Sequence, residues 1–264
     1  MPRLHNLKTL TLVASCLLAG IGATSPRAFA PAFAADAVPA AIAAAVADAS
    51  RPSADKERDA DRKPAEVVAF AGMKPGDKVM DILPGGGYFT RIFAKTVGPK
   101  GKVYAMVPAE MIKTRATAAD AINKLAAEAG YANVAVQSMP LADIKATEPL
   151  DIVWTSLNYH DMHNPMLGPV PMGGYNKAVF NALKSGGIYI VIDHAAVVGS
   201  GSRDTDSLHR MDPEAAKAEV TGVGFVLVGE SDLLQHPADD HTARVFDSGM
   251  RGKTDQFILK FRKP

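Results

Sequence analysis

The sequence has very little cysteine, and this limits the chemistry that it can support. Its only cysteine among 264 residues is Cys16, which lies within an apolar stretch close to the N-terminus. With no second cysteine, the chain can form neither an internal disulfide nor a thiolate metal site.

Long hydrophobic runs are also missing. The apolar stretch of residues 9–23 is shorter than the roughly 18 apolar residues expected of a membrane span. It follows Arg3 and Lys8, and the small-residue sequence AFA comes after it at residues 28–30 and again at 32–34. This order is typical of a secretory signal peptide over residues 1–30. We therefore expect an exported, periplasmic protein with no membrane span after cleavage, a retained anchor and lipoprotein processing at Cys16 being the alternatives.

An excess of charge of either sign is absent as well. The 29 basic and 28 acidic residues give a net charge of +1. Cleavage after residue 30 removes three basic and no acidic residues, which changes the net charge from +1 to −2. Because binding to nucleic acid needs clustered lysine and arginine, this composition argues against a general nucleic-acid partner. A small molecule is the expected partner, and the oligomeric state is open.

The remaining chain divides into a lead-in and one regular domain. Residues 31–62 are first rich in alanine and then charged, which predicts a linker or solvated lead-in. Residues 63–264 form a domain of about 200 residues. In this domain, strand-like and helix-like segments alternate, including a long helix predicted over residues 109–130.

This alternation predicts an α/β fold. We expect a Rossmann-like, doubly wound sheet of about seven strands with helices on both faces. The last two strands, at residues 225–231 and 256–263, are joined without a helix, which predicts a mostly parallel sheet with an antiparallel C-terminal edge strand. Such sheets bind ligands outside the carboxyl ends of their strands.

The first of these strand ends carries a glycine loop, DILPGGGYFT at residues 81–90. Gly85, Gly86 and Gly87 allow positive φ angles and a close approach of the backbone to a ligand. A helix predicted from about Tyr88 directs its free N–H groups toward the same space. The loop predicts a ligand site, and tight packing between strand and helix is the other interpretation.

The loop and the order of elements resemble the class I S-adenosylmethionine-dependent methyltransferases. Asp81 with Gly85 and Gly87 matches the acidic residue and glycine loop of that family. The segments PGGGYFT and HDMHN and the C-terminal tail are similar to an exported bacterial group of predicted methyltransferases. The resemblance implies S-adenosylmethionine as cofactor, with Asp81 and the three glycines at its amino-acid end.

The other end of the implied cofactor site departs from the family. Val107 stands where the family carries the acidic residue that binds the ribose hydroxyls, and valine accepts no hydrogen bond. Glu110, one helical turn later, and Asp143, after the third strand, are the candidates to replace the missing acidic groups. Asn158, at the end of the fourth strand, completes the predicted cofactor residues.

A cluster of histidines follows the fourth and fifth strands. The sequence NYHDMHN at residues 158–164 places His160 and Asp161 where the family brings the methyl group to the acceptor. We predict His160 as a neutral base, Asp161 as its orienting partner and His194 as a further catalytic residue.

Two other functions remain open from the sequence. His160, His163 and His194 could form the metal site of a different enzyme, although their spacing matches no specific metal motif and we predict none. The pocket could also serve a non-catalytic protein that binds a small ligand.

Overall fold

A computed structural model describes residues 37–168 and 170–264, and a seven-stranded sheet forms its centre. The strands are β1 Lys78–Ile82, β2 Lys102–Pro108, β3 Val134–Met139, β4 Leu150–Ser156, β5 Leu183–His194, β6 Val226–Ser231 and β7 Gln256–Arg262. The α-helices are α1 Ala40–Val46, α2 Ser53–Lys56, α3 Asp59–Arg62, α4 Pro64–Ala71, α5 Tyr88–Val97, α6 Ala109–Thr114, α7 Asp120–Ala126, α8 Met172–Ala182 and α9 Pro213–Thr221. The predicted signal peptide, with Cys16, lies outside the described residues.

The order of the strands confirms the predicted fold class. The sheet runs β3-β2-β1-β4-β5-β7-β6. All pairs from β3 to β5 are parallel, and β7 is antiparallel to both β5 and β6. The antiparallel C-terminal strand therefore lies one place inside the edge, which β6 forms.

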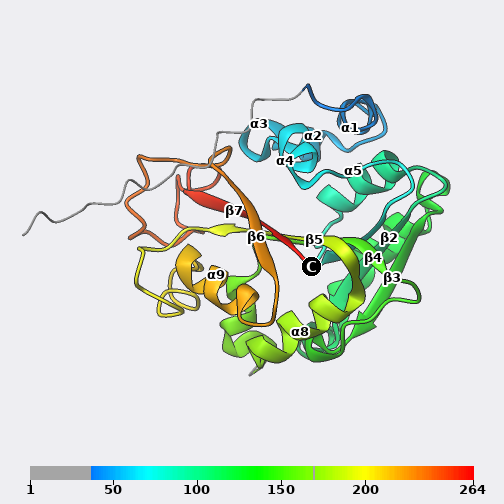
Figure 1. Cartoon of the computed structure of the whole chain (residues 1–264). Helices are drawn as coiled ribbons and strands as arrows, with labels where there is room; N and C mark the ends of the chain where they lie inside the picture. Colours follow the sequence, from blue (N-terminus) through cyan, green and yellow to red (C-terminus); the bar gives the residue numbers. More distant parts are fainter. Residues whose placement is uncertain (1–36, 169) are drawn as a thin grey trace, which may run out of the picture. The chain divides into compact units, whose positions relative to one another are not determined.

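Alternating side chains along the strands give the sheet two buried faces. Val79 and Met80, adjacent on β1, belong to different hydrophobic clusters, as the period of two in a strand requires. Helices α1, α4, α5 and α7 cover one face, and α8 and α9 cover the other (Figure 1). Trp154 of β4 packs against Phe89 and Phe93 of α5, with both pairs of ring centroids 5.0 Å apart.

The described part of the predicted lead-in packs onto this domain. Contacts group residues 38–264 into one unit, and Ile42 of α1 is fully buried in the cluster that α5 also contributes to. Arg51 is buried too, and its guanidinium lies 2.7 Å from the carboxylate of Asp59. The hydroxyl of Tyr88, the first residue of α5, donates to the same carboxylate at 2.7 Å. Residues 51–59 are thereby fixed beside the glycine loop.

The long helix predicted over residues 109–130 is interrupted. Arg115 has extended backbone angles, φ −142° and ψ 94°, between α6 and a 3-10 turn at Ala116–Ala119. Thr114 and Thr117 flank the break, and β-branched residues favour helices less than the neighbouring alanines do.

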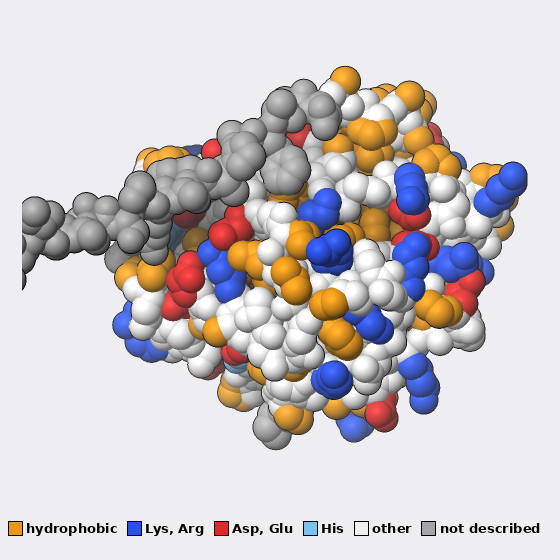
Figure 2. Space-filling view, in the orientation of Figure 1, with side chains coloured by type: hydrophobic (Ala, Val, Ile, Leu, Met, Phe, Trp, Pro, Cys, Tyr) orange, Lys and Arg blue, Asp and Glu red, His pale blue; other side chains and the backbone are white. Residues whose placement is uncertain are grey.

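The surface mixes charges of both signs. On the face in Figure 2, the lysine and arginine side chains of the described residues are dispersed among acidic and apolar ones. Among residues 37–168 and 170–264, no helix combines the length and the apolar character that crossing a membrane requires.

Candidate functional site

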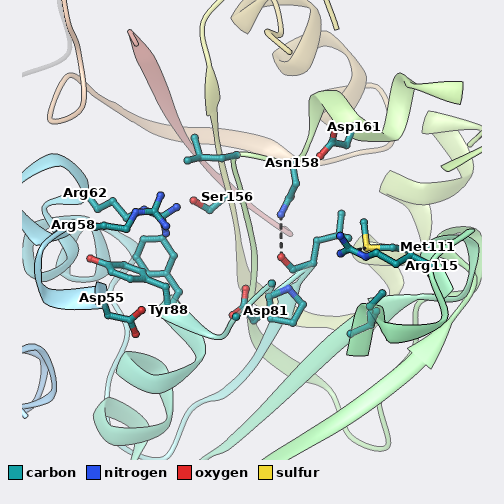
Figure 3. A pocket seen from close by; sticks show the side chains of 18 residues that line it. Asp55, Arg58, Arg62, Asp81, Tyr88, Met111, Arg115, Ser156, Asn158 and Asp161 are labelled. Atoms are coloured by element: carbon teal, nitrogen blue, oxygen red, sulfur yellow. Dashed lines mark hydrogen bonds between the residues drawn. The ribbon is translucent and has the colours of Figure 1, made fainter. Parts of the chain in front are cut away.

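A cavity of about 350 Å³ lies at the carboxyl ends of β1, β2 and β4 (Figure 3). This is the edge of the sheet at which the sequence predicts a ligand, and the volume is within the range of small-ligand pockets. Its lining combines charged, polar and apolar side chains from the lead-in, the glycine loop, α6 and the end of β4: Asp55, Arg58, Arg62, Asp81, Leu83, Pro84, Gly85, Gly86, Tyr88, Phe89, Val107, Met111, Arg115, Ala118, Ser156, Leu157, Asn158 and Asp161.

Asp81 provides a buried carboxyl group at one wall of the cavity. It belongs to β1, and the hydroxyl of Thr90 on α5 donates to it at 2.6 Å. Burial raises the pKa of Asp81 to about 7, and the hydrogen bond from Thr90 and the charge of Arg62 offset this only in part. A cation bound beside Asp81 would stabilise the ionised form, so the site is suited to a ligand ammonium group.

The three glycines of the loop lie in different environments. Gly85 and Gly86 line the cavity, as the sequence predicts for cofactor contact. Gly87 does not line it and is the N-cap of α5, with φ +85°. A Cβ at Gly87 would lie 2.7 Å from Leu125 Cδ1, so this glycine serves the packing of the loop.

The lead-in contributes two arginines that we did not predict as site residues. Arg58 and Arg62 are four residues apart and line the same side of the cavity (Figure 3). The guanidinium of Arg62 lies 4.5 Å from the centroid of the Tyr88 ring. Its buried Nε has no hydrogen-bond partner among the described residues, and burial lowers the pKa of Arg62 to about 10. The site thus holds a cationic group that lacks a full set of acceptors.

The opposite side of the cavity is mainly apolar. Met111 and Arg115 lie there, Arg115 after the break that ends α6 (Figure 3), and Val107 also lines the cavity. Glu110, predicted to replace the missing ribose acceptor, instead accepts a hydrogen bond from the backbone of Leu141 at 3.1 Å.

Neither of the predicted acidic substitutes reaches the cavity. Glu110 lines a separate pocket of about 380 Å³ beside α6, and Asp143 is exposed on the 3-10 turn Leu141–Asp143 and lines neither pocket. Of the residues at issue, only Val107 lines the cavity, and neither Glu110 nor Asp143 provides a carboxylate there.

Asn158 joins the ends of β4 and β1 at the cavity wall. Its side-chain amide donates to the carbonyl oxygens of Ile82 and Leu83 at 3.2 and 3.3 Å (Figure 3). Its side-chain oxygen accepts from the hydroxyl of Thr155. Because these bonds use most of its polar groups, Asn158 fixes the shape of the loop as well as lining the site.

His160 is located behind the cavity wall and is not suited to the predicted role of a neutral base. It is 2% exposed and does not line the cavity, whereas Asp161 does. Burial disfavours its charge, but the carboxylates of Asp193 and Asp161 outweigh this and raise the pKa of His160 to about 10. The group that faces the cavity is therefore Asp161, and His160 supports it with Nε2 3.2 Å from Asp161 Oδ1.

The other predicted histidines lie apart from the cavity lining. The Nδ1 of His194 is 2.8 Å from the hydroxyl of Thr254, and burial lowers the pKa of His194 to about 4. His163 Nε2 lies 3.3 Å from Glu219 Oε2 on α9. The structure therefore gives His160, His163 and His194 different partners rather than one shared ligand point.

A histidine outside the predicted catalytic residues lies beside His160 instead. His209, in the loop before α9, has its Nδ1 3.3 Å from His160 Nε2. The two are 49 residues apart in sequence, and the tertiary fold brings them together. A pattern in the local sequence could not have shown this proximity.

A protein-family model matches part of this chain. Residues 52–157, which are less than half of the chain, match the family model of protein-L-isoaspartate(D-aspartate) O-methyltransferase. No curated protein gives a significant sequence match.

Several solved structures share the fold at low sequence identity. A SAM-dependent methyltransferase from Aquifex aeolicus is 17% identical with a TM-score of 0.55, over 80% of this chain and 97% of its own. An arsenic(III) S-adenosylmethionine methyltransferase from Chlamydomonas reinhardtii is 17% identical with a TM-score of 0.51, over 86% and 74%. The cyclase SpnF is 16% identical with a TM-score of 0.56, over 78% and 82%. Because a cyclase shares this architecture, the likeness shows the fold and leaves the reaction to the site.

Proposed function

The chain has the fold of the class I S-adenosylmethionine-dependent methyltransferases, and from this we propose that it binds S-adenosylmethionine and methylates a small acceptor. The observation that carries the proposal is that a buried carboxyl group and a guanidinium line the same cavity. The carboxyl of Asp81 and the guanidinium of Arg62 both line it, and Arg62 lowers the pKa of Asp81 against the effect of burial.

These two groups are complementary to an α-amino acid. The ammonium of the cofactor's methionine part would pair with Asp81, and its carboxylate would pair with the guanidinium of Arg62, which also lines the cavity. Gly85 and Gly86 leave room for the ligand beside them, since a Cβ at either position would meet no atom within 4 Å.

The nucleoside would lie against the apolar side of the cavity. Val107, Met111 and Ala118 offer contact area to a flat base, and Arg115 adds hydrogen-bond donors. Since no carboxylate is present there to bind both ribose hydroxyls, we expect weaker cofactor binding than a bidentate acceptor would give.

We assign to Asp161 the role of taking the proton from the methyl acceptor. S-adenosylmethionine would supply the methyl group when bound, and a carboxylate at the cavity wall would take the proton that the acceptor loses. Asp161 is the lining carboxylate on the β4 side, and His160 and Asp193 behind it fix its position. The cavity volume of about 350 Å³ favours a small acceptor.

Calorimetric titration tests the cofactor proposal. We expect residues 31–264 to bind S-adenosylmethionine and S-adenosylhomocysteine with one site each. No binding at millimolar ligand would overturn the proposal, and binding without any turnover across a panel of small acceptors would favour a binding protein on this fold.

We also propose that the protein is exported to the periplasm. The support is the basic start, short apolar run and small-residue cleavage sequence within residues 1–34. Fractionation followed by N-terminal sequencing should give a periplasmic protein that begins at residue 31 or 35. An intact Met1 in the cytoplasmic fraction would contradict this.

A further inference from the structure

Three side chains beside the cavity direct their ligand atoms toward a common point. These atoms are His160 Nε2, His209 Nδ1 and Asp161 Oδ1, and they all lie within 4.8 Å of one another. The separations are 3.3 Å between the two histidine nitrogens, 3.2 Å from His160 to Asp161 and 3.7 Å from His209 to Asp161.

These separations have the size of a metal coordination triangle. Nitrogen and oxygen ligands bind Zn²⁺ at about 2.0–2.2 Å, so two ligands of one ion lie about 3–3.6 Å apart for octahedral to tetrahedral angles. Two imidazoles and one carboxylate form a donor set that first-row divalent transition metals favour over Mg²⁺ and Ca²⁺.

The surrounding residues orient His160 as such a site requires. Asp193 is fully buried, with Oδ1 2.8 Å from His160 Nδ1, and its Oδ2 accepts the backbone N–H of His160 at 2.7 Å. A histidine whose Nδ1–H donates to a carboxylate presents Nε2 to a metal once the Nε2 proton is released on binding, and this outer partner is common in metal sites.

His209 is held in place by its neighbour in the chain. It has a left-handed backbone, with φ +55°, which is uncommon for a residue other than glycine. The next residue, Arg210, is fully buried and pairs with Asp239 at 2.8 Å while donating to the carbonyl oxygens of Ala195 and Ala243. The contacts of Arg210 thus fix the backbone beside His209.

We propose that His160, Asp161 and His209 bind one divalent first-row transition-metal ion at the wall of the cavity. Asp161 lines the cavity, so the ion's remaining coordination positions would be close to the space for the acceptor. With the ion bound, Asp161 would be its ligand and would not take the acceptor's proton. This site differs from the histidine cluster considered from the sequence, because it uses His209 in place of His163 and His194. It does not depend on methyl transfer, because the ion can be bound without any cofactor.

The test is metal titration of untagged residues 31–264 after dialysis against a chelator. We expect Zn²⁺ to bind with a stoichiometry near one by calorimetry, and Co²⁺ to give a visible absorption band. His209→Ala and Asp161→Asn should abolish the band and weaken Zn²⁺ binding at least tenfold. Asp193→Asn, which changes none of the three ligand side chains but loosens the hold on His160, should weaken binding by about 10- to 100-fold.

His163→Ala is the matched control, since this histidine lies on the same 3-10 turn and is paired with Glu219. It should bind Zn²⁺ like the unchanged protein. If the unchanged protein binds no ion, or if His209→Ala binds as tightly as it does, the three side chains are only hydrogen-bonded to one another and the proposal fails. Because the side chain of His209 is partly exposed, His209→Ala should fold, and circular dichroism would verify this.

Discussion

Asp193 holds His160 through two atoms, because its carboxylate accepts the backbone N–H at 2.7 Å and lies 2.8 Å from the ring Nδ1. Both side chains are almost completely buried, and they connect the ends of β5 and β4. The position of Asp161 at the cavity wall depends on this connection, since it follows His160 directly.

Asp193→Asn should therefore destabilise the fold. Removal of one partner of a buried ion pair leaves the other without compensation, and we expect the free energy of unfolding to fall by about 3 kcal/mol. Urea denaturation would measure it. Asp232→Asn is the control, because Asp232 is exposed, and its effect should stay within about 0.5 kcal/mol. Equal effects of the two changes would show that the pair contributes nothing specific.

The buried carboxyl of Asp81 predicts a pH-dependent stability. Its pKa is raised to about 7 in the folded protein, against 3.8 for a free side chain. Between these values the folded state keeps the proton and the unfolded state loses it, so the free energy of unfolding falls as the pH rises. The full loss amounts to about 4 kcal/mol and is complete above pH 7.

Asp81→Asn should remove this dependence while keeping the acceptor for Thr90. Urea denaturation at pH 5 and pH 8 would compare the two proteins, and the unchanged protein should lose about 3 kcal/mol more between these pH values. The same loss in both proteins would mean that Asp81 does not titrate in this range.

Arg62→Met should weaken binding of the amino-acid part of the cofactor and leave binding of its nucleoside part unchanged. We expect the affinity for S-adenosylhomocysteine to fall about 10- to 100-fold, because a hydrogen bond to a charged group is lost. 5′-Methylthioadenosine has no amino-acid part, so its affinity should change less than twofold. Calorimetry would give both values, with Arg251→Met as a control on the surface. If the affinities for the two ligands fell by the same factor, Arg62 would not be the residue that binds the carboxylate of the amino-acid part.

The sheet and the glycine loop could be predicted because their signals are local. Alternating apolar segments specify strands and helices, and the helix start at Tyr88 follows directly from the glycines before it. The start of α9 is equally local, since Asp212 accepts a hydrogen bond from the backbone of Glu214, as a capping residue does.

The missed site residues depend on contacts between distant segments. Arg58 and Arg62 lie in a charged stretch whose pattern indicates solvation. Side chains of α5 fix that stretch, since Tyr88 donates to Asp59 and Arg91 pairs with Asp55. His209 lies beside His160 although the two are 49 residues apart in the sequence. Each relationship depends on the relative positions of two elements that are separate in the sequence, which local patterns do not predict.

Gly86→Val and Gly87→Ala should affect different properties, the first ligand binding and the second the stability of the fold. Gly86 lines the cavity, and a Cβ there would meet no atom within 4 Å. Its valine variant should fold normally but bind S-adenosylhomocysteine at least tenfold more weakly, because the new side chain occupies ligand space.

Gly87→Ala should instead weaken the fold. Its φ of +85° is unfavourable for alanine, and the new Cβ would lie 2.7 Å from Leu125 Cδ1. Since left-handed backbone alone costs about 1–2 kcal/mol, we expect a loss of at least about 2 kcal/mol in the free energy of unfolding. Thermal denaturation and calorimetry on both variants would check this. If Gly86→Val retains full affinity, the ligand does not approach the loop, and the loop serves the packing of β1 against α5 alone.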